Sequence, residues 1–315
     1  MKIITEQQIR NLEISPCTCV DWVKECFLFK NDAQLPAKLS IHFNENNFFN
    51  TMPCMLPDKF NIFGVKIVRR IDGAVPLLKS EILLYDTTNG ELLSILDGNW
   101  ITAMRTGAVA TLAIKTFRNN GYISYGIMGL GNTARATLIC LLENEPDTFH
   151  EVNILKYKNQ AELYIERFRN YKNVRFRIID SVEQLISSSD VIVSCVTGAK
   201  GIICEDDRLF RKGCLVVPVH TRGFQNCDLF FDKVFADDTN HVNNFKYFEQ
   251  FKYFAEIGDV LTGEKIGRIS SEERILSYNI GLGLHDVYFA SKIYSIMEHS
   301  IEDIKMNNLK EKFWL

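Results

Sequence analysis

Short apolar runs separated by turns dominate the first third of the chain, and this pattern is typical of an antiparallel sheet. The runs, which are rich in branched and aromatic residues, lie at 39–43, 63–68, 82–85 and 91–96. The sequence Asp86-Thr-Thr-Asn89-Gly90 supplies a turn between the last two of them. Residues 1–35 look helical and irregular, so we predict a helical segment followed by a mainly antiparallel sheet.

Residues 99–115 have the periodicity of a helix. One stripe of this helix is apolar and consists of Ile101, Met104, Ala108 and Leu112. At about 100° per residue, Arg105 falls about 40° from Ile101, within the same face. An arginine on an apolar face needs an anion, which is either a ligand carboxylate or an acidic side chain such as Glu81 or Asp97.

The second half of the chain opens on a glycine-containing turn between a strand and a helix. A short apolar strand, Ile-Ser-Tyr-Gly-Ile-Met, runs directly into Gly129-Leu-Gly131-Asn132-Thr133-Ala134. Gly129 permits the tight turn, Gly131 lets the backbone approach a pyrophosphate, and Ala134 lets the helix pack close to the strand. The first N–H groups of the helix, including those of Asn132 and Thr133, would then face the phosphates. This context predicts a dinucleotide cradle.

Strand and helix patterns alternate after this turn. Strands are expected at 152–156, 174–178, 190–195 and 214–219, and helices at 161–168 and 182–187. Such alternation predicts a parallel, doubly wound sheet of the Rossmann type, with ligands at the carboxyl ends of its strands. The segments 196–198 and 219–221, which contain Thr197 and His220, follow two of these ends. After a polar, aromatic segment beyond Asp238, a terminal helix begins near His285.

Composition narrows the possible partners and compartments. The 315 residues carry a net charge of -3, with 46% hydrophobic and 24% charged residues, which is ordinary for a two-domain soluble protein and gives no basic surface for nucleic acid. Small molecules are the expected partners. No run approaches the roughly eighteen apolar residues of a membrane span, and the nine cysteines contain no CxxC pair, so we expect reduced thiols and a cytoplasmic protein without a membrane segment. No cluster has zinc-ligand spacing, so no metal is predicted.

Four motifs together resemble the ornithine cyclodeaminase and mu-crystallin family. They are 97–108, which contains Arg105 and Thr106, the turn 129–134, the segment 256–268 and the segment 281–286. The resemblance extends along nearly the whole chain in order and spacing. It implies an α/β fold: a Rossmann domain at 118–283 for NAD(H) or NADP(H), and an α+β substrate-binding and dimerisation domain at 1–117 with 284–315. It also implies a homodimer.

The resemblance assigns roles to individual side chains. Arg105 and Lys66 fall where the family meets the substrate's carboxylate and reacting centre, although a strand lysine is otherwise usually an edge residue that points to water. Where the family has a Pro-x-Arg segment, this chain has a lysine, Lys38, which keeps the charge but loses the bidentate fork. Thr106, Thr197 and Asp286 are placed at the cofactor, with helix capping as the alternative for Asp286.

One segment departs from the family pattern. Many members carry a catalytic aspartate in a Gly-Ala-Asp segment after the fifth Rossmann strand, and no aspartate of 218–228 is in register with it. His220 and Asp228 are the candidates for proton handling there, and Arg222 is a candidate for a second substrate anion. A lone histidine is also often structural.

The second Rossmann strand favours NADP(H) over NAD(H). An acidic residue at its end would bind the ribose 2′-hydroxyl of NAD, but the chain places Lys156 and Lys158 there, which suit a 2′-phosphate. The alternative is that both lysines are solvated loop residues.

These features predict an NAD(P)-dependent oxidoreductase that acts on the C–N bond of a small amino or imino acid. Arg105, helped by Lys38, would hold the carboxylate, and Lys66 would assist proton movement at nitrogen. Dehydrogenase, imine reductase and cyclodeaminase chemistry all remain open. A mu-crystallin-like protein that binds NADPH and a small ligand with little turnover is the alternative, and a structural dimer with a vestigial cofactor site is a third hypothesis.

Overall fold

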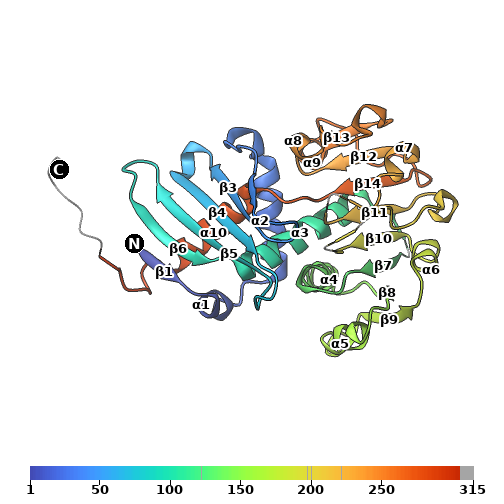
Figure 1. Ribbon diagram of the computed structural model, residues 1–315, viewed down its shortest axis with the longest axis horizontal. Coiled ribbons are helices and arrows are strands. Elements are labelled where there is room, and N and C mark those ends of the chain that lie inside the picture. The colour runs from blue at the N-terminus through green and yellow to red at the C-terminus, as the bar shows by residue number, and fades with distance from the viewer. Residues whose placement is uncertain (122, 197, 200, 221, 306–315) are drawn as a thin grey trace. The chain divides into compact units, whose positions relative to one another are not determined.

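The computed structural model describes residues 1–305 except 122, 197, 200 and 221, and the chain forms two compact units (Figure 1). Unit 1 contains Met1–Glu13, Asn31–Thr102 and the chain from Gly283 onward, whereas unit 2 contains Ile14–Lys30 and Ala103–Leu282. The units therefore change within a helix after Thr102, and not near residue 117 as the sequence suggested.

Unit 1 is built on a six-stranded sheet. Its strands, in spatial order, are β1 (Lys2–Ile4), β6 (Leu92–Asp97), β5 (Leu78–Asp86), β4 (Ile62–Arg70), β3 (Phe48–Met55) and β2 (Leu39–His42). All neighbours are antiparallel except β1 and β6. The prediction of a mainly antiparallel sheet is correct, but it missed β3, because Asn50, Thr51 and Pro53 interrupt the apolar pattern of that strand.

Helix α10 (Gly283–Met297) covers one face of this sheet by packing on β3, β4 and β5. Small residues allow the close approach. A Cβ atom at Gly64 of β4 would lie 2.8 Å from both Cγ atoms of Val287, and one at Gly283 would lie 3.1 Å from the Met52 carbonyl oxygen. Unit 1 also holds α1 (Glu6–Asn11), which a capping box at Thr5 begins, and the first residues of α3 (Asn99–Phe117).

Unit 2 is built on an eight-stranded, entirely parallel sheet. Its order is β13 (Phe254–Glu256), β12 (Lys233–Ala236), β14 (Ile275–Tyr278), β11 (Leu215–Pro218), β10 (Val191–Ser194), β7 (Ser124–Met128), β8 (His150–Leu155) and β9 (Val174–Ile179). The order reverses beside β7, so the sheet is doubly wound as predicted, and the α/β fold class is confirmed. Strands β13 and β14 lie in the segment beyond Asp238, whose sequence is polar and aromatic.

Helices connect these strands. They are α4 (Asn132–Asn144), α5 (Gln160–Glu166), α6 (Val182–Ser187), α7 (Cys227–Phe230), α8 (Thr239–Val242) and α9 (Ile257–Thr262).

Helix α2 (Pro16–Leu28) also belongs to unit 2, because its buried side packs on α4 and α9. At its end, Lys30 contacts the carboxylates of Asp238, at 2.7 Å, and Glu256. These contacts explain why residues 14–30 separate from the N-terminal domain to which the sequence assigned them.

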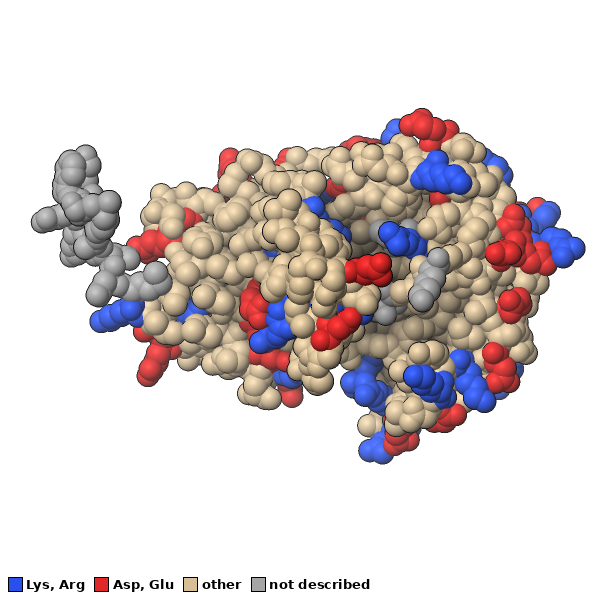
Figure 2. Space-filling view, viewed as in Figure 1, with Lys and Arg blue, Asp and Glu red and all other residues tan. Residues whose placement is uncertain are grey.

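Charge is spread over the surface. On the face shown in Figure 2, acidic and basic side chains are interspersed over both units. Among the described residues, the structure contains no helix with the length and apolar character needed to cross a bilayer.

Candidate functional site

The glycine turn after β7 has the geometry of a phosphate cradle. Gly129 has a φ of +79°, and a Cβ atom there would lie 2.4 Å from the carbonyl carbon of Cys195, so only glycine lets the ends of β7 and β10 lie together. Gly131 is the N-cap of α4 and provides no side-chain cap, and a Cβ atom at this position would meet open space. The thirteen-residue helix α4, whose first N–H groups have no intrahelical partners, begins directly after this open position.

This cradle fits the pyrophosphate of a dinucleotide. Asn132 and Thr133 form the first turn of α4, and their backbone lies at the positive end of the helix dipole. Ala134 is fully buried, and its carbonyl oxygen accepts a hydrogen bond from the Tyr164 hydroxyl at 2.9 Å. A larger residue at Ala134 would displace α4, so the small residue fixes the helix and its N-terminus.

Two side chains at the carboxyl edge of the sheet join neighbouring strands. The Ser194 hydroxyl, at the end of β10, lies 2.7 Å from Nε2 of His220, which follows β11. Burial lowers the pKa of His220, and a hydrogen bond to the backbone of Arg222 opposes that shift. The Ser194 hydroxyl therefore engages one ring nitrogen of His220.

Asp228, the other acidic candidate in this segment, lies in the core of unit 2. Its Oδ1 accepts a hydrogen bond from the Tyr278 hydroxyl at 2.8 Å, and Oδ2 has no hydrogen-bond partner within the described part of the chain. The residue is 1% exposed, and burial raises the pKa of its carboxyl to about 7, against the lowering effect of the Tyr278 hydrogen bond.

Arg105 lies on α3 with 5% of its surface exposed. Gly281, which has a φ of +100°, lies directly against it, because a Cβ atom there would be 2.3 Å from the Nη1 atom of Arg105. The segment that carries Gly281 was singled out from sequence without a reason for its glycine. The structure supplies the reason, since this residue leaves room for the guanidinium. Thr106 follows Arg105 on α3 and is half-buried.

Lys66 and Asp286 form an ion pair inside unit 1. Lys66 Nζ donates a hydrogen bond to Asp286 Oδ1 at 3.0 Å, and the two residues are 1% and 0% exposed. Lys66 comes from β4, and Asp286 from the first turn of α10. Lys66 is thus not an edge lysine facing water, and Asp286, which the sequence placed at the cofactor, contacts Lys66.

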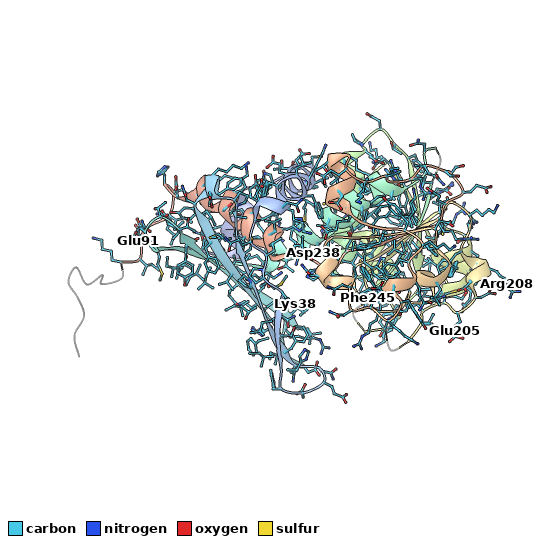
Figure 3. The ribbon with its side chains drawn as sticks, turned by 90° about the horizontal axis from the view of Figure 1, so that it is seen from above. Lys38, Glu91, Glu205, Arg208, Asp238 and Phe245 are labelled. Carbon is cyan, nitrogen blue, oxygen red and sulfur yellow. The ribbon has the colours of Figure 1, made fainter. Side chains whose placement is uncertain are left out.

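The remaining candidates lie on loops. Lys38 is exposed at the base of the β2–β3 hairpin (Figure 3). Lys156 and Lys158 follow β8 and are exposed. Lys156 Nζ lies 3.5 Å from Asp180 Oδ1, and Lys158 has a φ of +52°. Thr197 lies outside the residues that the structure describes.

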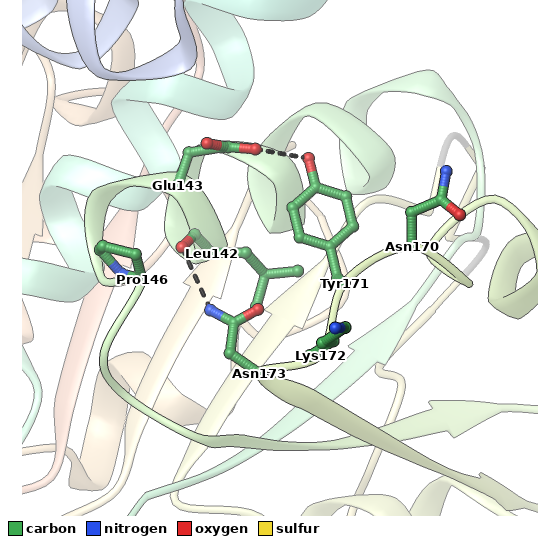
Figure 4. A pocket seen from close by; sticks show the side chains of 7 residues that line it. All are labelled: Leu142, Glu143, Pro146, Asn170, Tyr171, Lys172 and Asn173. Carbon is green, nitrogen blue, oxygen red and sulfur yellow. Dashed lines mark hydrogen bonds between the residues drawn. The ribbon is translucent and has the colours of Figure 1, made fainter.

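A pocket of about 590 Å³ lies at the other end of α4, away from the glycine turn (Figure 4). Its lining residues are Leu142, Glu143, Pro146, Asn170, Tyr171, Lys172 and Asn173. The Tyr171 hydroxyl donates to Glu143 at 2.8 Å, and the Asn173 amide donates to the Leu142 carbonyl at 3.3 Å. The polar side chains of Tyr171 and Asn173 are thus hydrogen-bonded within the pocket. The pocket lies at the C-terminal end of α4 and lacks the glycine turn and helix N-terminus that form the cradle.

Sequence reasoning missed three residues that the structure joins to the candidates. Ser194, Tyr278 and Gly281 each contact a candidate that is at least 26 positions away in the chain, as the separation of Ser194 and His220 shows. No pattern of neighbouring residues in the sequence predicts such contacts.

Comparison with known proteins agrees with this arrangement. The sequence profile of the ornithine cyclodeaminase/mu-crystallin family matches residues 2–300. A Delta(1)-pyrroline-2-carboxylate reductase from Bacillus cereus is 25% identical over 281 residues, which are 82% of this chain and 85% of that protein.

Solved structures show the same fold. Thermococcus litoralis Delta(1)-pyrroline-2-carboxylate reductase, in complex with NADH and L-proline, has a TM-score of 0.85 at 22% identity, over 96% of this chain and 100% of that one. An archaeal alanine dehydrogenase dimer with bound NAD has a TM-score of 0.83, also at 22% identity, over 98% and 99% of the two chains.

Proposed function

The chain belongs to the ornithine cyclodeaminase/mu-crystallin family, and we propose that it is an NAD(P)-dependent oxidoreductase acting on the C–N bond of a small amino or imino acid. The observation that carries this proposal is the open cradle of Gly129 to Ala134, at the carboxyl edge of a parallel sheet. The buried guanidinium of Arg105 supports it, because such a group binds a carboxylate well.

Reduction of a cyclic imino acid is the reaction we favour within this class. The Bacillus cereus relative is named as a reductase of pyrroline-2-carboxylate, a cyclic imino acid. Two other reactions use the same C–N chemistry: oxidation of an amino acid, and ring closure with loss of ammonia. An assay of substrates in both directions separates the three reactions.

Arg105 is proposed to hold the substrate carboxylate. A guanidinium binds a carboxylate through two parallel N–H donors, which fixes the orientation of the neighbouring carbon. Lys38 would add a second positive charge from its loop. A bound nicotinamide would supply the hydride, and Arg105 would orient the imine carbon for it.

Lys66 is proposed to supply the proton that the imine nitrogen takes up during reduction. His220 is the less suitable proton carrier, because burial lowers its pKa and its Nε2 is bonded to Ser194. Asp228 is also less suitable, since its carboxyl is bonded to Tyr278 inside the core. In this proposal His220 holds the loop after β11 against the end of β10.

The cofactor is a nicotinamide dinucleotide, and we propose that NADP(H) is preferred over NAD(H). Lys156 and Lys158 support this preference, because they provide positive charge after β8 where a 2′-phosphate would lie. The Lys156 contact with Asp180 joins two exposed side chains and is weak, so it does not remove Lys156 from this role.

Titration by nicotinamide fluorescence tests the cofactor preference. NADPH should bind more tightly than NADH, and Lys158→Ala should reduce the difference about tenfold, since a charge-assisted contact to phosphate contributes about 1.5–3 kcal/mol. Lys172→Ala, a lysine of the pocket at the other end of α4, is the control. Tighter binding of NADH by the unaltered protein would contradict the lysine argument.

An assay of cyclic imines and amino acids, in both directions and with both cofactors, tests the reaction. We expect reduction of Delta(1)-pyrroline-2-carboxylate. Proline and ammonia formed from ornithine would indicate cyclodeaminase chemistry, and amino-acid oxidation without a ring product would indicate a dehydrogenase. Firm NADPH binding with no turnover of any compound would favour the mu-crystallin-like binding protein, an alternative that the burial of Asp228 keeps open.

Replacement of Arg105 tests the carboxylate clamp. Arg105→Ala should lower kcat/KM by about a hundredfold or more, because a charged partner of the substrate is lost, while cofactor affinity is retained. Lys115→Ala, an exposed lysine on the same helix, is the matched control and should leave kcat/KM unchanged. Equal kcat/KM in Arg105→Ala and the unaltered protein would remove Arg105 from the site.

A homodimer is also part of the proposal. The archaeal alanine dehydrogenase of the same fold is described as a dimer. Unit 1 supports the same state here, since the β2 side chains Leu39 and Ile41 are 61% and 60% exposed.

A further inference from the structure

Lys66 and Asp286 form a buried ion pair, and this geometry bears on the charge of the lysine. Both residues are almost completely buried, and they lie 3.0 Å apart within unit 1. Lys66 lies on the face of β4 that α10 covers. Opposite it in the strand register lie Met52 on β3 and Ile82 on β5. An ammonium in such a layer is stable only with a counter-ion.

The fold brings that counter-ion to Lys66 by a specific route. Gly64, two residues before Lys66 on the same face of β4, lets Val287 of α10 lie against the strand. The neighbouring Asp286 therefore reaches the lysine although its side chain is short. Asp286 also lies in the first turn of its helix, where the helix dipole favours a carboxylate over a carboxylic acid.

A third titratable residue, Cys54, lies near this pair. Cys54 on β3 pairs with Gly64 in the strand register. Burial raises the pKa of its thiol to about 12, and the charge of Asp286 adds to that shift. Asp286 from α10 and Cys54 from β3 are titratable groups near Lys66 in unit 1. His285 precedes Asp286 and is buried as well, while β5 presents Ile82.

We propose that Asp286 is the positioning residue for Lys66: its carboxylate holds the lysine as an ammonium, so that Lys66 acts as the proton donor to the substrate nitrogen and not as a base. This inference rests on the proposed function. In imine reduction, hydride from the dihydronicotinamide forms the new C–H bond, and the C=N π electrons form an N–H bond with a proton from Lys66. The lysine is left as a neutral amine beside the carboxylate and regains its proton from solvent.

The pH dependence of imine reduction tests this role. Asp286→Asn keeps the size and a hydrogen-bond acceptor but removes the charge. In the plot of turnover against pH, the decline on the alkaline side should move by about one pH unit or more toward acid pH. Turnover of the variant should approach that of the unaltered protein at acid pH, because the ammonium forms again there. Asp286→Glu, which keeps the charge, should retain the original alkaline decline. Glu298→Gln, which removes a carboxylate just beyond α10, is the control.

A uniform loss of turnover at every pH in Asp286→Asn would overturn the proposal, since a purely structural role predicts that result. An alkaline decline in Asp286→Asn at the same pH as in the unaltered protein would also overturn the proposal.

A second measurement needs neither turnover nor a stable Asp286 variant. In protein labelled with 13C at lysine Cε, the signal of Lys66 is identified by its disappearance in Lys66→Arg. In the unaltered protein this signal should stay at the ammonium position from about pH 6 to pH 9. A signal at the neutral-amine position near pH 7 would refute the inference. Because this spectrum is recorded without substrate, absence of turnover on every imine would refute the proposed function while leaving the charge of Lys66 measurable.

Discussion

Asp228 shows how one buried carboxyl can determine the pH response of a whole unit. Its surroundings on α7 and β14 include Cys227 and Tyr278, and both belong to the main apolar core of unit 2. In this environment the carboxylate form is strongly disfavoured, and the pKa rises from its ordinary value of 3.8 to about 7. The carboxyl is therefore protonated in the folded protein at pH values where it is ionised in the unfolded chain.

Linkage gives the sign of the resulting pH dependence. The folded-state pKa lies above the unfolded one, so the stabilisation by this group is complete below about pH 4 and is lost as the pH rises through about 7. Asp228→Asn cannot ionise and should lose less stability than the unaltered protein between pH 5 and pH 8. The difference should be on the order of a few kcal/mol in the free energy of unfolding.

Urea denaturation of both proteins at the two pH values measures this difference. Asp147→Asn, in an exposed turn of unit 2, is the matched control and should keep the original pH dependence. Equal pH dependence in Asp228→Asn and the unaltered protein would show that the carboxyl is not protonated in the fold.

At the scale of elements, the contact between α3 and α4 positions the cradle. A Cβ atom at Gly107 on α3 would lie 2.4 Å from the Ala136 carbonyl carbon and 2.5 Å from the Thr137 backbone nitrogen on α4. The side-chain hydroxyl of Thr111, one turn further along α3, donates to the Thr137 carbonyl at 3.0 Å. Two helices that touch through their backbones therefore fix the position of α4, which carries the cradle at its N-terminus.

Gly107→Ala should consequently destabilise unit 2, although alanine is the better helix former. Replacing glycine in a helix gains about 1 kcal/mol in propensity, whereas the clash is with backbone that cannot rotate away and should cost about 1–3 kcal/mol or more. Gly131→Ala is the comparison, because its Cβ atom would meet open space and its φ of -84° is ordinary.

Thermal unfolding and NADPH titration separate the two variants. Gly107→Ala should lower Tm, while Gly131→Ala should keep Tm but weaken cofactor binding by about tenfold or more, since the added methyl group would stand where the pyrophosphate approaches. Full cofactor affinity in Gly131→Ala would exclude this turn as the phosphate site.

At the scale of the whole molecule, the second face of the unit 1 sheet points to self-association. Register places Leu39 and Ile41 on the face opposite α10, together with Phe49. Val65 and Leu83 continue this face across β4 and β5 and are only partly buried. The same face also carries Arg69 and Glu81 in register with Phe49 and Ile67, and exposed apolar side chains mixed with charged ones are typical of an interface with another copy.

Ile41→Lys should therefore shift the protein from dimer to monomer, because a lysine at the interface leaves an unpaired charge there. Ile41 is 60% exposed, so the substitution should leave the fold of a single chain intact. Ser40→Lys, on the other face of the same strand, is the control and should remain dimeric. Light scattering after gel filtration measures the mass, and an unaltered protein that is monomeric would refute the dimer.

Local sequence was sufficient for much of this molecule. The two-residue and 3.6-residue periodicities predicted most strands of both sheets, the helix that carries Arg105, and the doubly wound class. The cradle at Gly129 to Ala134 could also be predicted, because its turn, its N-cap and its helix are set by adjacent residues. The motifs were specific enough to identify the family.

Contacts between distant segments were decided only by the tertiary structure. Strand β14 lies between β11 and β12, and α2 packs in unit 2, because apolar faces select their partners by shape after the chain has collapsed. Lys66 and Asp286 are separated by 220 positions, and a close approach of α10 to β4 at Gly64 joins them. Periodicity tells which face of an element is buried, but it does not tell which charge will lie against that face.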